Sequence, residues 1–180
     1  MNANSLLLER NHQFVERFEA ADLPIFPVLN TLVLTCIDAR VDPAHILGLE
    51  LGDAVIVRNN GGRVTRAAIE EIATLAFMVG KMTQNPEPEF NVVLMQHTQC
   101  GAETFANTDF QTALKDALGI DVSESAIFDQ ETDLMRDIDR LAESPVIPGS
   151  LTVSALLYDV KTGRVREIGA PRKLAELRGH

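Results

Sequence analysis

Three short runs of almost wholly apolar residues, rich in β-branched side chains, most constrain the fold of this chain. They cover residues 32–36, 54–57 and 91–95. Because apolar and polar side chains do not alternate within them, these runs predict strands that are buried on both faces of a parallel sheet. Two further runs, 151–158 and 164–168, flank the turn-rich segment 159–163. They predict a β-hairpin at one end of the sheet.

Helical patterns fill the intervals between the predicted strands. Segments 65–80, 108–119 and 131–143 carry apolar residues at helical spacing. The first of these helices is expected to begin after the capping residue Thr65 and to close at Gly80. Strands that alternate with helices predict an α/β fold, in which a mainly parallel central sheet is flanked by helices.

An amphipathic stretch, 6–20, precedes the first predicted strand and carries Leu7, Phe14, Val15 and Phe18. It predicts an N-terminal helical arm within residues 1–28. Two interpretations stay open. The arm packs either on a partner subunit or on the core of its own chain.

The composition excludes several classes of function. A length of 180 residues predicts a single domain, 1–180. A net charge of -10, without a cluster of Lys or Arg, argues against binding to nucleic acid or to an anionic membrane. No apolar run approaches the roughly 18 residues of a membrane span, and the first residues lack a signal-peptide pattern. The sequence therefore predicts a soluble, cytoplasmic protein.

The first chemical motif is Cys36-Ile37-Asp38-Ala39-Arg40, at the end of the first predicted strand. If the chain stays extended, the side chains of Cys36, Asp38 and Arg40 point to the same side. The pattern fits a metal-binding cysteine beside a carboxylate that accepts a hydrogen bond and is held by the planar fork of the arginine. The alternative is a buried cysteine next to an unrelated surface ion pair.

The second motif, His97-Thr98-Gln99-Cys100, follows the third predicted strand, and Gly101 after it would let the backbone approach a site. Ligands of such sheets bind beyond the carboxyl ends of the strands, so the two motifs are expected to meet there. Two thiolates and one imidazole are a ligand set of catalytic zinc, which leaves a fourth position for water. A metal site is therefore predicted, rather than a disulfide.

Segment 58–62 ends the second predicted strand and is expected at the same edge of the sheet. One interpretation makes it a wall of the pocket, in which Gly61 or Gly62 gives steric room. The other makes it a plain turn whose glycines adopt a positive φ. The candidate substrate-binding residues are accordingly Asn59, Gly61 and Gly101.

Together these residues resemble the β-class carbonic anhydrases, in order, spacing and strand context. The matching strings are C-x-D-x-R-V-x-P from Cys36 to Pro43, Gly52-Asp53, Val57-Arg58-Asn59 with the glycine pair, and H-T-x-C-G from His97 to Gly101. Some positions differ from the family pattern. Gln99 stands where the family often has Asp, Asn60-Gly61-Gly62-Arg63 replaces a commoner Ala-Gly-Asn, and the chain has no Trp.

The resemblance implies a β-carbonic-anhydrase-like fold and one Zn²⁺ per chain, held by Cys36, His97 and Cys100. It implies Asp38 and Arg40 as the catalytic pair. The implied reaction is the reversible hydration of carbon dioxide to bicarbonate and a proton by a zinc-activated water. The implied assembly is a homodimer or homotetramer with active sites near the subunit interface.

Two alternatives to this reaction stay open. Some proteins of this fold hydrolyse carbonyl sulfide or carbon disulfide at the same kind of zinc site. The chain could instead be a non-catalytic zinc-binding module with a closed fourth position. The Asp38–Arg40 pair favours chemistry, because a structural zinc site needs neither residue.

Overall fold

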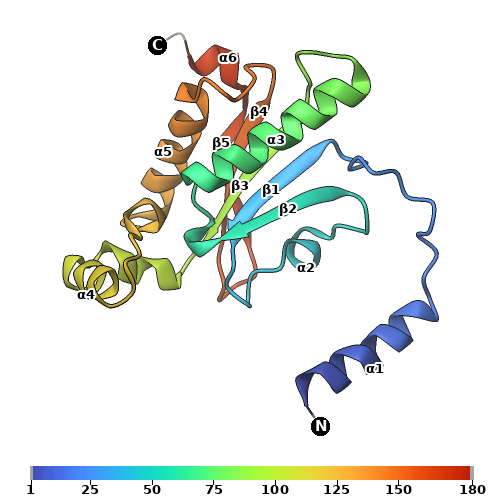
Figure 1. Ribbon diagram of the computed structural model, residues 1–180, viewed down its shortest axis with the longest axis horizontal. Coiled ribbons are helices and arrows are strands. Elements are labelled where there is room, and N and C mark those ends of the chain that lie inside the picture. The colour runs from blue at the N-terminus through green and yellow to red at the C-terminus, as the bar shows by residue number, and fades with distance from the viewer. Residues whose placement is uncertain (1, 179–180) are drawn as a thin grey trace.

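The centre of the fold is a five-stranded sheet in the order β2-β1-β3-β4-β5, in a computed structural model that describes residues 2–178 (Figure 1). The strands are β1 (Thr31–Cys36), β2 (Ala54–Asn59), β3 (Asn91–His97), β4 (Thr152–Tyr158) and β5 (Val165–Lys173). The first four are mutually parallel, and β5 is antiparallel to β4. This arrangement confirms the mainly parallel sheet and the hairpin at one end of it.

The burial expected for the first three strands holds for β1 and β3 but is wrong for β2. Strand β2 lies at the edge of the sheet, where Ile56 is 39% exposed and Arg58 is also exposed. Its other face sends Val55 and Val57 into the core. An apolar run thus predicts a strand but does not distinguish a central strand from an edge strand.

One face of the sheet carries most of the core. The helices packed there are α3 (Arg66–Thr83), α5 (Gln130–Glu143) and α6 (Leu174–Leu177). The opposite face is covered by the five-residue helix α2 (Pro43–Leu47), which packs near Val33 and Met95. The sheet is therefore covered unevenly, although parallel sheets are usually covered on both faces.

The start of α3 was predicted correctly, but its end was not. Thr65 is the N-cap, and its side chain accepts a hydrogen bond from the backbone N of Ala68. The helix continues through Gly80 and closes at Gln84, whose φ is 55°. The chain after the helix folds back so closely that a Cβ on Gly80 would lie 2.8 Å from the carbonyl oxygen of Asn85. That glycine permits close packing and does not end the helix.

Two helices stand away from the sheet, namely α1 (Ala3–Val15) and α4 (Thr108–Leu118) (Figure 1). Neither helix has a buried side chain anywhere along its described length. Helix α1 ends at Val15, before the predicted Ala20, and Leu7 and Phe14 on it are exposed. The chain does not fold this arm onto its own core. No helix in residues 2–178 is long and apolar enough to cross a membrane.

The order of the strands creates a natural ligand position. Strand β1 has β2 on one side and β3 on the other. The chain therefore adds β2 on one side of β1, and then crosses back to add β3 on the other side. Ligands of open α/β sheets bind at such a switch point, beyond the carboxyl ends of the strands. Cys36 is the last residue of β1 and His97 is the last residue of β3.

Candidate metal centre

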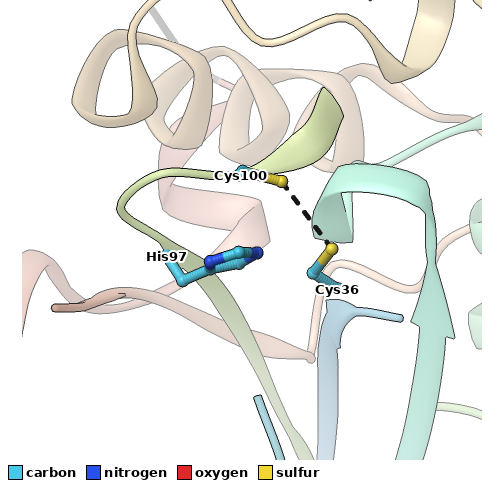
Figure 2. Close-up of side chains that lie close together, drawn as sticks. All are labelled: Cys36, His97 and Cys100. Carbon is cyan, nitrogen blue, oxygen red and sulfur yellow. Dashed lines mark hydrogen bonds between the residues drawn. The ribbon is translucent and has the colours of Figure 1, made fainter. Parts of the chain in front are cut away.

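Three donor side chains meet at the carboxyl ends of β1 and β3, as Figure 2 shows. The Sγ atoms of Cys36 and Cys100 and a ring nitrogen of His97 all lie within 4.8 Å of one another, and all three residues are buried. Gln99 has a φ of 57°, so the chain turns sharply between His97 and Cys100. The structure thus brings together the three predicted ligands.

The two sulfur atoms are spaced as a tetrahedral metal site requires. Sγ of Cys36 lies 3.7 Å from Sγ of Cys100. Two bonds of about 2.3 Å to one tetrahedral zinc ion would place the sulfurs about 3.8 Å apart. The hydrogen bond from Cys100 lowers the pKa of Cys36 to about 4. The same hydrogen bond and burial raise the pKa of Cys100, since two thiolates side by side repel each other. A divalent cation would relieve that repulsion.

His97 is set up to offer its other nitrogen as a ligand. Nδ1 lies 3.0 Å from the carbonyl oxygen of Thr98, which assigns the proton to Nδ1. Nε2 is buried and, among the described residues, has no hydrogen-bond partner. An unpaired buried acceptor is unfavourable unless something binds to it. A metal ion between Nε2 and the two sulfurs fits this donor set, and a backbone carbonyl on Nδ1 is the usual support of a ligating histidine.

The Asp38–Arg40 pair lies beside the three donors. Nε and Nη2 of Arg40 donate to the two carboxylate oxygens of Asp38 at 2.9 and 2.6 Å. These hydrogen bonds hold the pKa of Asp38 well below its usual range. Oδ2 of Asp38 lies 4.0 Å from Nε2 of His97. A fixed carboxylate therefore faces the donor group without joining it.

The path of the chain to this pair differs from the extended geometry expected. A turn closes after Cys36, in which the backbone N of Val41 donates to the carbonyl oxygen of Asp38 at 2.9 Å. The backbone N of Arg40 also donates to Oδ1 of Asp38 at 2.9 Å. The turn, rather than strand alternation, places Arg40 against Asp38. The prediction that Asp38 and Arg40 lie together was right. The reason given for it, an extended chain, was wrong.

Arg58, at the end of β2, fixes the backbone of the first motif. Its Nε donates to the carbonyl oxygen of Cys36 at 3.0 Å, and its Nη2 donates to that of Asp38 at 2.8 Å. The sequence alone predicted no separate role for this residue. The available signal was a charged residue near the end of an otherwise apolar strand.

The glycines of segment 58–62 do adopt positive φ, 79° at Gly61 and 62° at Gly62. They also give steric room, but the chain itself fills that room. A Cβ on Gly62 would lie 2.9 Å from the backbone N of Cys36, and one on Gly61 would lie 3.1 Å from the carbonyl oxygen of Ser125. The turn interpretation is therefore confirmed, with the turn packed tightly behind the first ligand. The pocket-wall interpretation stays a prediction.

The other two substrate-binding candidates differ in their surroundings. The side chain of Asn59 is engaged with the backbone of Arg63, through hydrogen bonds of 2.7 and 2.9 Å. Gly101 is exposed, and a Cβ added there would meet no described protein atom within 4 Å. A direct role toward a substrate stays a prediction for all three residues, and Gly101 has the most open surroundings.

Comparison with known proteins decides the family. A family model described as carbonic anhydrase matches residues 31–165, which is most of the chain and includes every residue of the donor group. The chain belongs to the β-class carbonic anhydrase family. This membership agrees with the resemblance found in the two motifs and in segment 58–62, which we call the glycine turn.

The relatives that this chain resembles are described as two different enzymes. Beta-carbonic anhydrase 1 of Mycobacterium tuberculosis is 28% identical over 163 residues, which cover 89% of this chain and 94% of the relative. A carbon disulfide hydrolase of Saccharolobus solfataricus is 28% identical over 162 residues, which cover 75% of each. The crystal structure of a carbonic anhydrase from Streptococcus mutans is 35% identical, with a TM-score of 0.76, and the match covers 94% of this chain and 99% of that chain. The family and fold are therefore shared by proteins described as acting on different substrates.

Proposed function

We propose that this chain is a zinc-dependent carbonic anhydrase, which interconverts carbon dioxide with bicarbonate and a proton. The observation that carries the proposal is the group of three buried donors beside a carboxylate that an arginine holds in place. Cys36, His97 and Cys100 would hold the zinc ion. Bound there, zinc would acidify a water molecule and so supply a nucleophile for carbon dioxide.

Asp38 and Arg40 are the proposed catalytic pair. An ionised carboxylate only accepts hydrogen bonds, so Asp38 would accept one from the nucleophile and turn a lone pair of that nucleophile toward carbon dioxide. Oδ2 is the proposed acceptor, since it lies 4.0 Å from Nε2 of His97. Arg40 keeps Asp38 ionised and holds both carboxylate oxygens, so that the carboxylate does not swing into the ligand group.

The test is stopped-flow carbon dioxide hydration on protein of measured zinc content, over a series of pH values. We expect fast hydration at one zinc per chain, with a rate that rises toward alkaline pH. Two thiolates and a neutral imidazole cancel the charge of the cation, so water there is a weaker acid than under three neutral ligands, where it titrates near about 7. Bound zinc without hydration at any pH would contradict the proposal. A rate that is flat from mildly acid to alkaline pH would contradict the expected weak acidity of the zinc-bound water.

A second candidate is hydrolysis of carbon disulfide or carbonyl sulfide. It is favoured by the similarity to the carbon disulfide hydrolase of Saccharolobus solfataricus. The same zinc-loaded preparation, assayed on carbon dioxide and on each sulfur compound, separates the two enzymes by the ratio of kcat/KM values. A non-catalytic zinc module would show no rate on any of them and no change on Asp38→Asn.

We also propose that the working unit is a homodimer or homotetramer. Helix α1 carries exposed apolar side chains, and none of its described side chains is buried. One face of the sheet is covered mainly by the short helix α2. A second copy of the chain would cover such surfaces, since exposed apolar patches mark sites of association. The expected cytoplasmic location stays a prediction.

A further inference from the structure

A buried ion pair lies behind the metal centre and was not foreseen from the sequence. Arg63 is only 5% exposed, and Asp137 on α5 is fully buried. Nε and Nη2 of Arg63 donate to Oδ2 and Oδ1 of Asp137 at 2.7 and 3.1 Å. Apolar residues of similar volume usually give equal or greater stability than such a pair. Stability alone therefore does not explain why charges occupy this position.

The first attachment of the pair leads to Cys36. The backbone of Arg63 closes the glycine turn through its two hydrogen bonds with the side chain of Asn59. The carbonyl oxygen of Asn59 accepts a hydrogen bond of 3.0 Å from the backbone N of Ile37. Within the turn, Gly62 packs against the backbone N of Cys36. Fixing Arg63 thus fixes the backbone on both sides of the first ligand.

The second attachment leads to Cys100. Nη1 of Arg63 donates to the carbonyl oxygen of Ala126. The next residue, Ile127, is 1% exposed and packs in one cluster with Cys36 and Cys100. Its backbone N also donates to the carbonyl oxygen of Ala102 at 3.2 Å. The guanidinium therefore holds the segment whose apolar side chain packs in the same buried cluster as the two cysteines.

The third attachment leads to His97. Oδ2 of Asp137 lies 3.5 Å from Nε2 of Gln96, the residue directly before His97 in β3. The same oxygen accepts a hydrogen bond of 3.2 Å from the backbone N of Val64, which follows Arg63. One carboxylate thus contacts both the strand that ends in His97 and the end of the glycine turn.

We propose that Arg63 and Asp137 form a positioning clamp for the metal ligands. The clamp joins the three segments that present Cys36, His97 and Cys100, and it holds their donor atoms at the spacing that the metal needs. Neither residue belongs to the group of three donors, so both act by positioning that group. The inference rests on the proposed zinc site and deepens it. Partners outside the ligand group of metal sites typically change metal affinity by about 10–100-fold when they are removed.

The test compares zinc affinity, measured by competition with a chelator, with the thermal stability of the metal-free protein. Arg63→Met combined with Asp137→Leu removes both charges and fills the space with apolar atoms. The buried Asp133, whose Oδ1 also lies 3.7 Å from Nη2 of Arg63, keeps its ion pair with Arg136 at 3.1 Å in this variant. We expect metal-free stability close to that of the wild type, with zinc affinity lower by about 10–100-fold. With cobalt in place of zinc, the thiolate-to-metal absorption bands should shift as well. A clamp that only supported folding would change none of the metal readouts in this variant.

The matched control removes an ion pair that also attaches to α5 but lies at the surface. Arg166 and Glu131 are joined at 2.5 Å, with side chains 60% and 53% exposed. Arg166→Gln with Glu131→Gln should keep wild-type zinc affinity. If the double variant of the clamp does not fold, Arg63→Lys decides the matter, because a lysine keeps the charge but loses the fork that binds Asp137 and Ala126 together.

The outcomes separate the clamp from the proposed function. A wild-type protein that binds no zinc would overturn the zinc site and the clamp with it. Wild-type protein that binds zinc, together with clamp variants of unchanged affinity and cobalt spectrum, would overturn the clamp and leave the zinc site standing. Weakened affinity in the clamp variants, with the surface control unchanged, supports both.

Discussion

Nη2 of Arg40 lies 2.6 Å from Oδ2 of Asp38, the carboxylate oxygen that faces the donor group. The same Nη2 atom donates to the carbonyl oxygen of Gln99 at 3.0 Å. Gln99 lies between His97 and Cys100, so Arg40 links the motif after β1 to the motif after β3. The arginine therefore controls both the direction of the carboxylate and the relative position of the two halves of the site.

This relationship predicts the effect of Arg40→Ala. Without the arginine, Asp38 should turn toward the metal and take the fourth position, because a carboxylate is itself a zinc ligand. Hydration of carbon dioxide should fall by about 100-fold or more while one zinc per chain is retained. The measurement is kcat with zinc content, together with a crystal structure of the zinc-loaded variant. A structure in which Asp38 stays clear of the metal would show that Arg40 has another role.

Removal of the metal should lower the melting temperature of the protein. The two crowded sulfur atoms and the unpaired Nε2 of His97 would then stay buried without a metal to bind them. At a thousandfold excess of free zinc over its Kd, binding stabilises the folded state by about 4 kcal/mol. For a chain of this size that amounts to roughly 8–16 °C. Calorimetry in the presence of a reductant, before and after chelation, gives the difference.

The control for this experiment is the choice of ion added back. Zinc should restore the melting temperature, whereas magnesium should not, since thiolates favour softer metals. Equal restoration by magnesium would mean that the donor group is not the metal site.

The sequence predicted the donor group because its signals were local. Cys36 and His97 each follow an apolar run, and parallel strands bring their carboxyl ends to one edge of the sheet. What the sequence did not predict depends on tertiary contacts. Whether β2 lies at the edge of the sheet depends on strand order, which its apolar run does not encode. The turn through Ala39 depends on a hydrogen bond between Arg40 and Asp38.

The clamp shows the same limit most clearly. Arg63 and Asp137 are 74 positions apart, so no spacing rule connects them. One signal was nevertheless present. Asp137 falls beside Ile138, three positions after Leu134, on the apolar face of α5. A carboxylate on such a face predicts a buried partner, because an unpaired buried charge is strongly unfavourable. The identity of that partner required the fold.

A glycine substitution should separate backbone strain from damage to the site. Gly62→Ala introduces a strained left-handed residue, at about 1–2 kcal/mol. It also adds a Cβ that would lie 2.9 Å from the backbone N of Cys36, and such overpacking costs about 1–3 kcal/mol more. The expected result is a loss of unfolding free energy larger than backbone strain alone would cause, together with a loss of bound zinc. Urea unfolding measures the first and metal analysis the second.

Gly163→Ala is the matched control for that substitution. Gly163 has a φ of 73°, close to the 62° of Gly62, but an added Cβ there meets nothing within 4 Å among the described residues. It should show the strain alone and keep its zinc. Equal effects of the two variants would mean that the contact behind Cys36 is unimportant.

The last prediction concerns the N-terminal arm. On α1, Leu7 is 60% exposed and Phe14 is 44% exposed, and both belong to the apolar face that has no cover within the chain as described. If a second copy covers this face, Leu7→Glu with Phe14→Glu should place charges in the interface and shift the protein to monomers. Sedimentation velocity measures the mass, and Ser5→Glu, at an exposed polar position of the same helix, is the control. An unchanged assembly in the double variant would assign the interface to another surface, and a monomeric wild type would refute the proposed assembly itself.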